Sequence, residues 1–137
     1  MDWMLLPYAR YFDFAGRSRR MEYWMFQLFI VLGYAALMVA ILMSGGGVEV
    51  GEAEAAPGPL VLMIFVVASI WAIATVIPTF ALTIRRLHDT NRSGFWILIG
   101  FVPIVGGLVL LYFMLIEGTR GPNLFGADPK EGLPRGV

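Results

Sequence analysis

The chain has 137 residues, of which 58% are hydrophobic and 15% charged, and its ten basic residues balance ten acidic ones. Soluble domains carry about 25% charged residues, so this composition argues against a soluble domain. A net charge of zero argues against nucleic acid as a partner. The chain has no cysteine, which excludes disulfides, a thiolate nucleophile and cysteine metal sites.

Residues 1–22 mix aromatic rings with charged side chains, a composition that is typical of the membrane interface. Three arginines, Arg17, Arg19 and Arg20, stand just before the first long apolar run. Such a cluster has an ordinary role as a positive-inside anchor, and it also attracts anionic lipid headgroups. We therefore predict an interfacial, cytoplasmic segment whose arginines lie near phosphates.

Three apolar runs follow, at residues 23–43, 60–84 and 95–116, and none contains Asp, Glu, Lys or Arg. At 1.5 Å per residue, each run is at least about 30 Å long as a helix, which is enough to cross a bilayer. The runs show no polar stripe of the kind that a soluble core helix needs. We predict an all-α integral membrane protein, a single membrane domain with three transmembrane helices.

The third run, 95–116, contains Pro103 and the pair Gly106 and Gly107 near its middle. Proline and glycine at this position are compatible with one kinked helix or with a broken, re-entrant hairpin. Irregular backbone in lipid must be shielded by protein. For that reason the single transmembrane helix is the preferred prediction and the hairpin is the alternative.

A polar stretch, residues 85–96, separates the second run from the third. Asp89 lies within helical reach of Arg85 and Arg86, and His88 suits the end of a helix. We predict that Glu22, at the start of the first span, pairs with Arg85 or Arg86. Ser93 is a candidate N-cap for the third span. The predicted interface anchors are three tryptophans: Trp3, Trp24 and Trp96.

The arginines also predict topology. Four precede the first span, none lies in the Gly- and Glu-rich residues 44–59, and three lie in residues 85–94. The positive-inside rule therefore predicts that the N-terminus and the 85–94 loop are cytoplasmic. The turn-rich tail, residues 117–137, lies outside if there are three spans and returns to the cytoplasm if the third run is a hairpin.

Three blocks of residues resemble a known family. The first is Gly-Arg-Ser-Arg-Arg-Met-Glu-Tyr-Trp at 16–24, the second is Arg-Arg-Leu-His-Asp at 85–89 with Arg-Ser-Gly at 92–94, and the third is the tail block at 118–129, which includes Asn123. Together they resemble the domain of unknown function 805 family of small bacterial inner-membrane proteins. The resemblance implies a location in the bacterial inner membrane and a three-block architecture, and it implies no activity.

These observations predict a non-catalytic membrane protein whose cytoplasmic face binds anionic lipid headgroups or a protein partner. The predicted binding residues are six arginines: Arg17, Arg19, Arg20, Arg85, Arg86 and Arg92. The predicted structural polar cluster consists of Glu22, His88, Asp89, Ser93 and Asn123. The alternative is a subunit of a small oligomeric transporter or channel, although the spans carry none of the ionisable groups that substrate pathways normally need.

We predict no cofactor, no metal and no catalytic residue. One histidine and no cysteine are too few ligands for a usual histidine or cysteine metal site. An enzyme would need Ser18 or Ser93 within hydrogen-bonding distance of His88 to activate a serine nucleophile. Expected partners are membrane lipids and either a second copy of the chain or another membrane protein.

Overall fold

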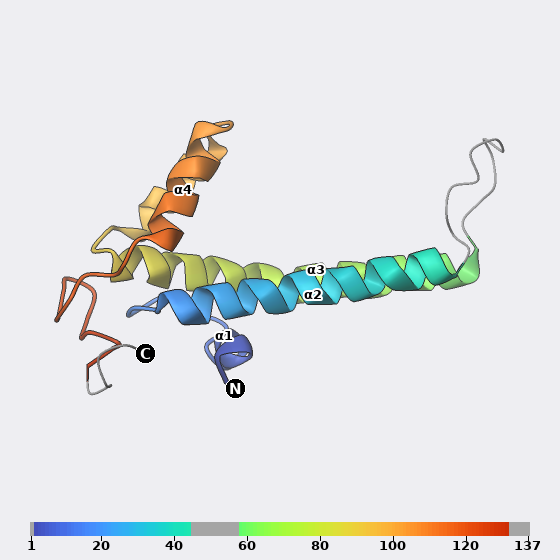
Figure 1. The fold of residues 1–137 in the computed structure, drawn as a ribbon, viewed down its shortest axis with the longest axis horizontal. Helices are drawn as coiled ribbons and strands as arrows, with labels where there is room; N and C mark the ends of the chain where they lie inside the picture. The colour runs from blue at the N-terminus through green and yellow to red at the C-terminus, as the bar shows by residue number, and fades with distance from the viewer. Residues whose placement is uncertain (1, 45–57, 132–137) are drawn as a thin grey trace.

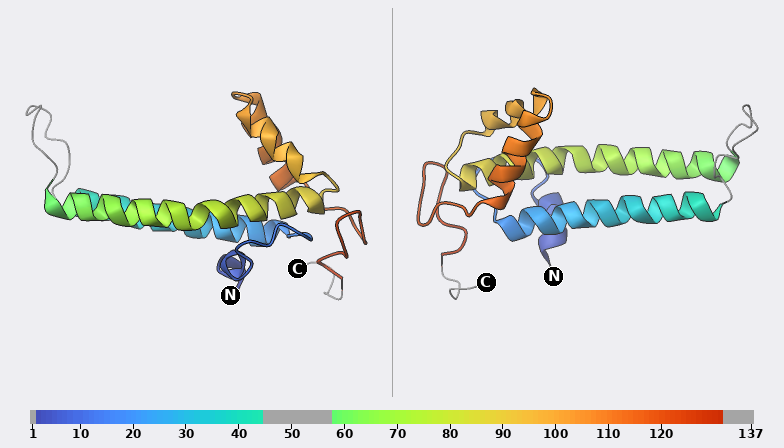
Figure 2. Two further views of the ribbon diagram at one scale, coloured as in Figure 1. Left: turned by 180° about the vertical axis from the view of Figure 1, so that it is seen from behind. Right: turned by 45° about the horizontal axis from the view of Figure 1, so that its top comes forward.

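The computed structural model describes residues 2–44 and 58–131. Within these ranges the elements are helical: η1 (Asp2–Met4), α1 (Leu6–Ala9), α2 (Arg20–Met43), α3 (Pro59–Asp89), η2 (Gly94–Phe101) and α4 (Val105–Leu115). The helices α2 and α3 lie side by side as a long antiparallel rod (Figures 1 and 2). The η2–α4 pair leaves one end of this rod at an angle. The all-helical prediction is thus confirmed for the described residues.

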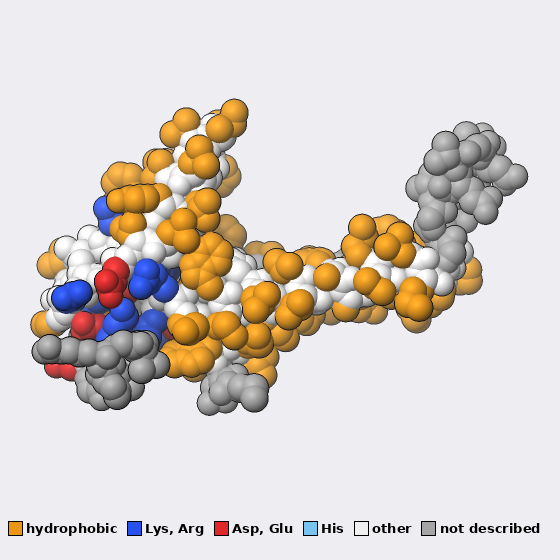
Figure 3. Space-filling model, in the orientation of Figure 1, with side chains coloured by type: hydrophobic (Ala, Val, Ile, Leu, Met, Phe, Trp, Pro, Cys, Tyr) orange, Lys and Arg blue, Asp and Glu red, His pale blue; other side chains and the backbone are white. Residues whose placement is uncertain are grey.

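The rod is long enough and apolar enough to cross a membrane. At 1.5 Å per residue, α2 and α3 are about 36 Å and about 46 Å long. Their most apolar 18-residue windows are only 6% and 17% buried within the protein, so most of the rod exposes hydrophobic side chains (Figure 3). A surface of this kind needs lipid or another apolar partner around it.

Close contact at one glycine and one tryptophan holds the two helices together. A Cβ atom at Gly33 would come within 2.7 Å of the Trp71 ring, so only glycine lets the two backbones approach this closely. Phe29 packs on the same tryptophan at 5.2 Å between ring centroids. Pro78 lies inside α3 without ending it.

The second span is longer than its apolar run. The helix α3 continues through residues 85–89, so that Arg85, Arg86, His88 and Asp89 lie on its last turns rather than in a loop. The turn itself occupies residues 90–93, where Asn91 adopts a left-handed backbone (φ 57°). This places the charged side chains directly against the elements that surround the end of α3.

The prediction of one continuous helix over residues 95–116 is wrong, because the run is broken into two helical arms, as in a hairpin. The 3₁₀-helix η2 ends at Phe101, the backbone turns at residues 102–104, and α4 runs back. Pro103 has no N–H for a continuous helix, and Ile104 takes a positive φ of 64°. A Cβ atom at Gly106 would overlap the carbonyl oxygen of Ile99, so this glycine lets the two arms touch.

Hydrogen bonds close the tip of this hairpin internally. The N–H of Val102 donates to the carbonyl of Ile99 at 2.9 Å, and the N–H of Gly106 donates to the carbonyl of Val102 at 3.0 Å. Internal pairing of this kind is what irregular backbone requires in an apolar environment. At its base, the hairpin packs Phe113 and Met114 against Leu87 of α3 in a small buried core.

Candidate functional site

Charged side chains gather at one end of the rod, where the N-terminal segment, the hairpin base and the tail meet (Figure 3). They form two distinct sets. We call the first the internal arginine cluster: Arg17, Arg85 and Arg86 with the carboxylates of Glu22 and Asp89. The side chains of these arginines are only 2%, 0% and 0% exposed.

Arg85 joins the N-terminal segment to α3. Its Nε donates to the hydroxyl of Ser18 at 2.9 Å, and one Nη donates to Glu22 Oε1 at 3.3 Å. The other Nη donates to the carbonyl oxygens of Arg10, at 3.2 Å, and Asp13. The predicted pairing of Glu22 with Arg85 or Arg86 is therefore present, with Arg85, and it locks α2 to α3.

Arg17 and Arg86 share the carboxylate of Asp89, one on each oxygen. Arg17 Nε donates to Oδ1 at 3.0 Å, and Arg86 Nη1 donates to Oδ2 at 2.7 Å. Charge-assisted bonds of this type are among the stronger polar contacts in proteins. A carboxylate between two guanidinium groups also offsets the repulsion between the arginines.

The same two arginines fasten the tail. Arg17 donates to the carbonyl of Gly121 at 2.7 Å and to that of Thr119, and Arg86 donates to that of Ile116. The N–H of Thr119 donates in turn to the carbonyl of Asp89 at 2.8 Å. Backbone carbonyls of residues 116–121 thus accept the hydrogen bonds that the sequence had suggested for lipid phosphates.

His88 and Asn123 form a second link between α3 and the tail. The Nδ1 of His88 donates to the carbonyl of Gly16 at 3.1 Å, and its ring stacks on Phe125 with centroids 4.0 Å apart. Asn123 Nδ2 donates to the carbonyl of His88 at 2.8 Å. The predicted structural polar cluster therefore assembles around the end of α3, with the exception of Ser93.

Ser93 acts locally. Its hydroxyl accepts a hydrogen bond from the N–H of Phe95 at 3.4 Å at the start of η2, which is the predicted capping role in front of a 3₁₀-helix. Arg92 lies nearby, with its guanidinium carbon 4.2 Å from the centre of the Phe113 ring. Trp96 is partly exposed and packs edge-on against the same ring at 5.5 Å.

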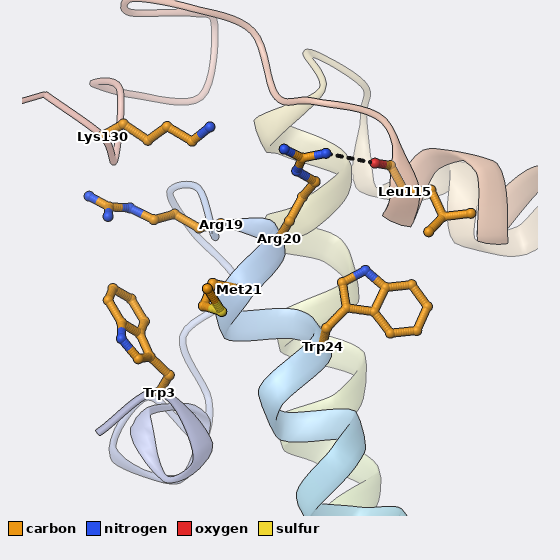
Figure 4. Close-up of a pocket in the computed structure, with 7 residues that line it drawn as sticks. All are labelled: Trp3, Arg19, Arg20, Met21, Trp24, Leu115 and Lys130. Atoms are coloured by element: carbon orange, nitrogen blue, oxygen red, sulfur yellow. Dashed lines mark hydrogen bonds between the residues drawn. The ribbon is translucent and has the colours of Figure 1, made fainter. Parts of the chain in front are cut away.

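The second set of charges lies at the surface, in what we call the cationic groove. This groove of about 390 Å³ runs between η1, the start of α2, the end of α4 and the tail. Its lining is Trp3, Arg19, Arg20, Met21, Trp24, Leu115 and Lys130 (Figure 4). It combines three cations with two tryptophans and two other apolar side chains.

The groove is held open by contacts on both sides. Trp24 Nε1 donates to the carbonyl of Met114 at 3.3 Å, and Arg20 donates to that of Leu115 at 3.2 Å. Arg19 lies over the Trp3 ring, 5.5 Å from its centre. Lys130 pairs with Glu117 at 2.9 Å on the exposed surface, and this pair lowers the pKa of the Glu117 carboxyl.

The structure thus divides the six predicted arginines. Arg17, Arg85 and Arg86 are buried structural groups rather than a docking surface for headgroups, because internal carboxylate, hydroxyl and carbonyl oxygens accept hydrogen bonds from most of their donors. Among the described residues, the buried Nε of Arg86 has no partner. Arg19 and Arg20 face the groove, and Arg92 covers Phe113 instead. Sequence reasoning missed Lys130 as a groove residue, because only the folded-back hairpin brings the tail beside α2.

Comparison with known proteins gives the chain a family. The profile described as "Protein of unknown function (DUF805)" matches residues 11–127. The chain is 42% identical over 132 residues to the "Inner membrane protein YhaI" of Escherichia coli K12, covering 96% of this chain and 98% of the relative. It is 37% identical over 130 residues to the "Inner membrane protein YhaH" of the same strain, covering 95% and 98%.

A third relative, the "Uncharacterized protein YiiR" of E. coli K12, is 29% identical over 145 residues, covering 88% of each chain. No solved structure matches. The chain belongs to the DUF805 family, and the resemblance drawn from its three sequence blocks is confirmed. The close relatives are named inner-membrane proteins, in agreement with the two long exposed apolar helices.

Proposed function

We propose that this DUF805 protein is a non-catalytic inner-membrane protein whose cationic groove binds anionic lipid headgroups at the cytoplasmic surface. The observation that carries the proposal is the groove itself: Arg19, Arg20 and Lys130 stand beside Trp3 and Trp24 where the apolar surface of the rod ends. Tryptophan favours the headgroup level of a bilayer, and clustered basic residues there attract anionic lipids.

The topology that places the groove in the cytoplasm has the rod spanning the membrane and the η2–α4 hairpin entering it from one side. Each arm of the hairpin is about 16 Å long, roughly half of a hydrocarbon core of about 30 Å. Arg17 binds the tail through Thr119 and Gly121, so the N-terminal segment and the tail belong on the same side. The positive-inside rule applied to the arginines predicts that this side is the cytoplasm.

Single cysteines test this topology, because the natural chain has none. Leu124 is 86% exposed in the tail and Met43 is 84% exposed at the far end of α2. With a membrane-impermeant maleimide, Leu124→Cys is expected to react only in inside-out vesicles and Met43→Cys only in intact spheroplasts. Labelling of both thiols from the same side would contradict the proposed arrangement.

Lipid binding is tested by the thermal stability of the full chain in nanodiscs of neutral or anionic phospholipid. Each basic residue near an anionic surface contributes about 1 kcal/mol, so the three groove cations should raise the unfolding midpoint in anionic discs. Added salt should reduce this gain, because it screens exposed charges. Equal midpoints in the two kinds of disc would refute headgroup binding.

Two variants, compared per charge removed, assign the effect to the groove. The triple variant Arg19→Gln, Arg20→Gln, Lys130→Gln should lose the stabilisation by anionic lipid. Arg120→Gln removes an exposed tail cation that does not line the groove, and it should keep most of the gain. A loss in Arg120→Gln of about a third of that in the triple variant, in proportion to the charge removed, would point to a diffuse surface charge.

The transporter alternative finds less support in the described residues. The hydroxyls of Thr75, Thr79 and Thr83 each bond to a carbonyl of their own helix, at 2.7 to 3.0 Å. They therefore offer few free polar groups to a solute. Flux of a solute into proteoliposomes above an empty-vesicle control would favour the transporter.

The non-catalytic part of the proposal is supported by the contacts of the residues that an enzyme would need. His88 bonds to Gly16, Ser18 accepts from Arg85, and Ser93 caps η2. Each polar side chain is therefore used in holding the fold. Covalent labelling of Ser18 or Ser93 by a serine-directed probe, abolished in His88→Ala, would overturn this assignment.

A further inference from the structure

The cations of the groove form two separate subsites (Figure 4). Arg19 and Lys130 lie on the side of Trp3, whereas Arg20 lies toward Trp24 and Leu115. Each subsite therefore has at least one cation and one tryptophan. A ligand that carries one phosphate fits one subsite, and a ligand with two phosphates on a short linker fits both.

The charge balance of the groove agrees with two phosphates. Three cations line it, and Lys130 forms a 2.9 Å pair with the carboxylate of Glu117. The groove together with this carboxylate therefore carries a net charge of +2. Glu22, in the first turn of α2, does not add to this charge because it pairs with Arg85 in the interior. Two phosphodiesters, with one negative charge each, would therefore neutralise the groove.

The rim of the groove indicates a lipid rather than a soluble anion. Trp3, Met21, Trp24 and Leu115 are all more than a third exposed, as are apolar side chains further along α2 and α4, such as Leu28 and Leu111. Apolar side chains contribute nothing to the binding of a bare phosphate. They are suited to the glycerol and first methylene groups of a phospholipid that lies beside the protein.

We infer that the groove is a discrete site for one phospholipid molecule with two phosphate groups, of the cardiolipin type. One phosphate lies between Arg19 and Lys130 and the other beside Arg20. This inference rests on the proposed headgroup binding and goes beyond it, because it requires a single lipid to bridge both subsites. Joining two binding groups makes the second contact intramolecular, which increases affinity without any new contact.

Native mass spectrometry of the detergent-purified full chain tests the inference by counting bound lipids. Cardiolipin and phosphatidylglycerol are titrated at equal phosphate concentration, with neutral phosphatidylcholine as the reference. We expect one cardiolipin per chain, bound at a phosphate concentration at least about tenfold lower than phosphatidylglycerol requires. Arg19→Gln with Lys130→Gln should abolish this preference, whereas Arg120→Gln should preserve it.

Each contrary outcome has a distinct meaning. Equal binding of cardiolipin and phosphatidylglycerol at equal phosphate overturns the two-phosphate site and leaves headgroup binding intact. If neither cardiolipin nor phosphatidylglycerol binds better than phosphatidylcholine, the proposed function is overturned as well. Displacement of cardiolipin by pyrophosphate at equal phosphate would overturn the lipid as the ligand. Circular dichroism of each variant establishes that a loss of binding is not a loss of fold.

Discussion

The internal arginine cluster and the cationic groove lie next to each other and use the same residue type for opposite purposes. Arg17 is buried and bound to Asp89 and the tail, while Arg19, two residues later, lines an open groove. The difference arises from the start of α2 at Arg20: the extended residues before it send Arg17 into the gap between α3 and the tail. Burial, and not charge, separates a structural arginine from one that is available for the proposed lipid binding.

The largest effect is expected from removing the carboxylate that the internal cluster shares. In Asp89→Asn, Arg17 and Arg86 lose their negative partner in a buried site. Breaking a buried ion pair on one side costs about 3–5 kcal/mol, so the thermal unfolding midpoint in detergent should fall strongly and trypsin should cut faster at Arg120.

The exposed ion pair between Lys130 and Glu117 provides the control for Asp89→Asn. Glu117→Gln removes the partner of Lys130 at the surface, where ion pairs contribute little. The unfolding midpoint should hardly change. If Glu117→Gln destabilised the protein as much as Asp89→Asn does, the distinction between a structural and a surface set of charges would be lost.

A second prediction disturbs the internal cluster without changing any charge. A Cβ atom at Gly118 would overlap the carboxylate of Asp89, so Gly118→Ala must push the tail away from Arg17 and Arg86. Overpacking of this kind costs about 1–3 kcal/mol. We expect a lower unfolding midpoint and faster trypsin cleavage at Arg120. A stable variant with a protected tail would show that the close approach at Gly118 is unimportant.

Much of this architecture was predictable and some of it was not. The runs at 23–43 and 60–84 correspond to helices because an uncharged apolar run of that length has one stable form in a membrane. The pairing of Glu22 with α3 followed from the need to balance clustered arginines. Pro103 and the glycines indicated a break in the third run. The backbone hydrogen bonds at the tip of the hairpin, which satisfy its polar groups in an apolar environment, depend on three-dimensional geometry that the sequence does not show.

The docking of the tail was beyond sequence reasoning. Arg17 and the carbonyl of Gly121 are 104 residues apart, and Arg17 and Asp89 are 72 apart. No local pattern reports such contacts, and the arginines at positions 17, 19 and 20 look equivalent in the sequence. Consequently the prediction assigned headgroups to arginines that bind carbonyls, and it left Lys130 out of the site.

A third prediction concerns the packing between the two arms of the hairpin, away from the charged end of the rod. Gly106→Ala should force the arms of the hairpin apart at Ile99 and cost about 1–3 kcal/mol. Gly107→Ala is the matched control, because a Cβ atom there meets nothing within 4 Å and alanine favours the helix. Thermal unfolding of both variants in detergent gives the comparison. Equal midpoints would mean that the arms do not touch at Gly106.

The smallest effect concerns pH and the outer part of the tail. The Asp128 carboxylate accepts hydrogen bonds from the N–H groups of Lys130 and Gly121, each at 2.9 Å, and these bonds lower its pKa below the ordinary value of 3.8. A depressed pKa in the fold means that this contribution is complete above about pH 4 and is lost as the pH falls through the lower value of the folded protein.

A nitroxide on Leu124→Cys reports this change directly, since the Leu124 side chain is exposed in the tail. The label should become more mobile as the pH falls below about 4. The ratio of ordered to mobile label should change by no more than about fivefold, because exposed polar contacts are weak. In an Asp128→Asn background the label should be more mobile at neutral pH and respond less to acid. An unchanged acid response in that background would assign the transition to a carboxylate other than Asp128.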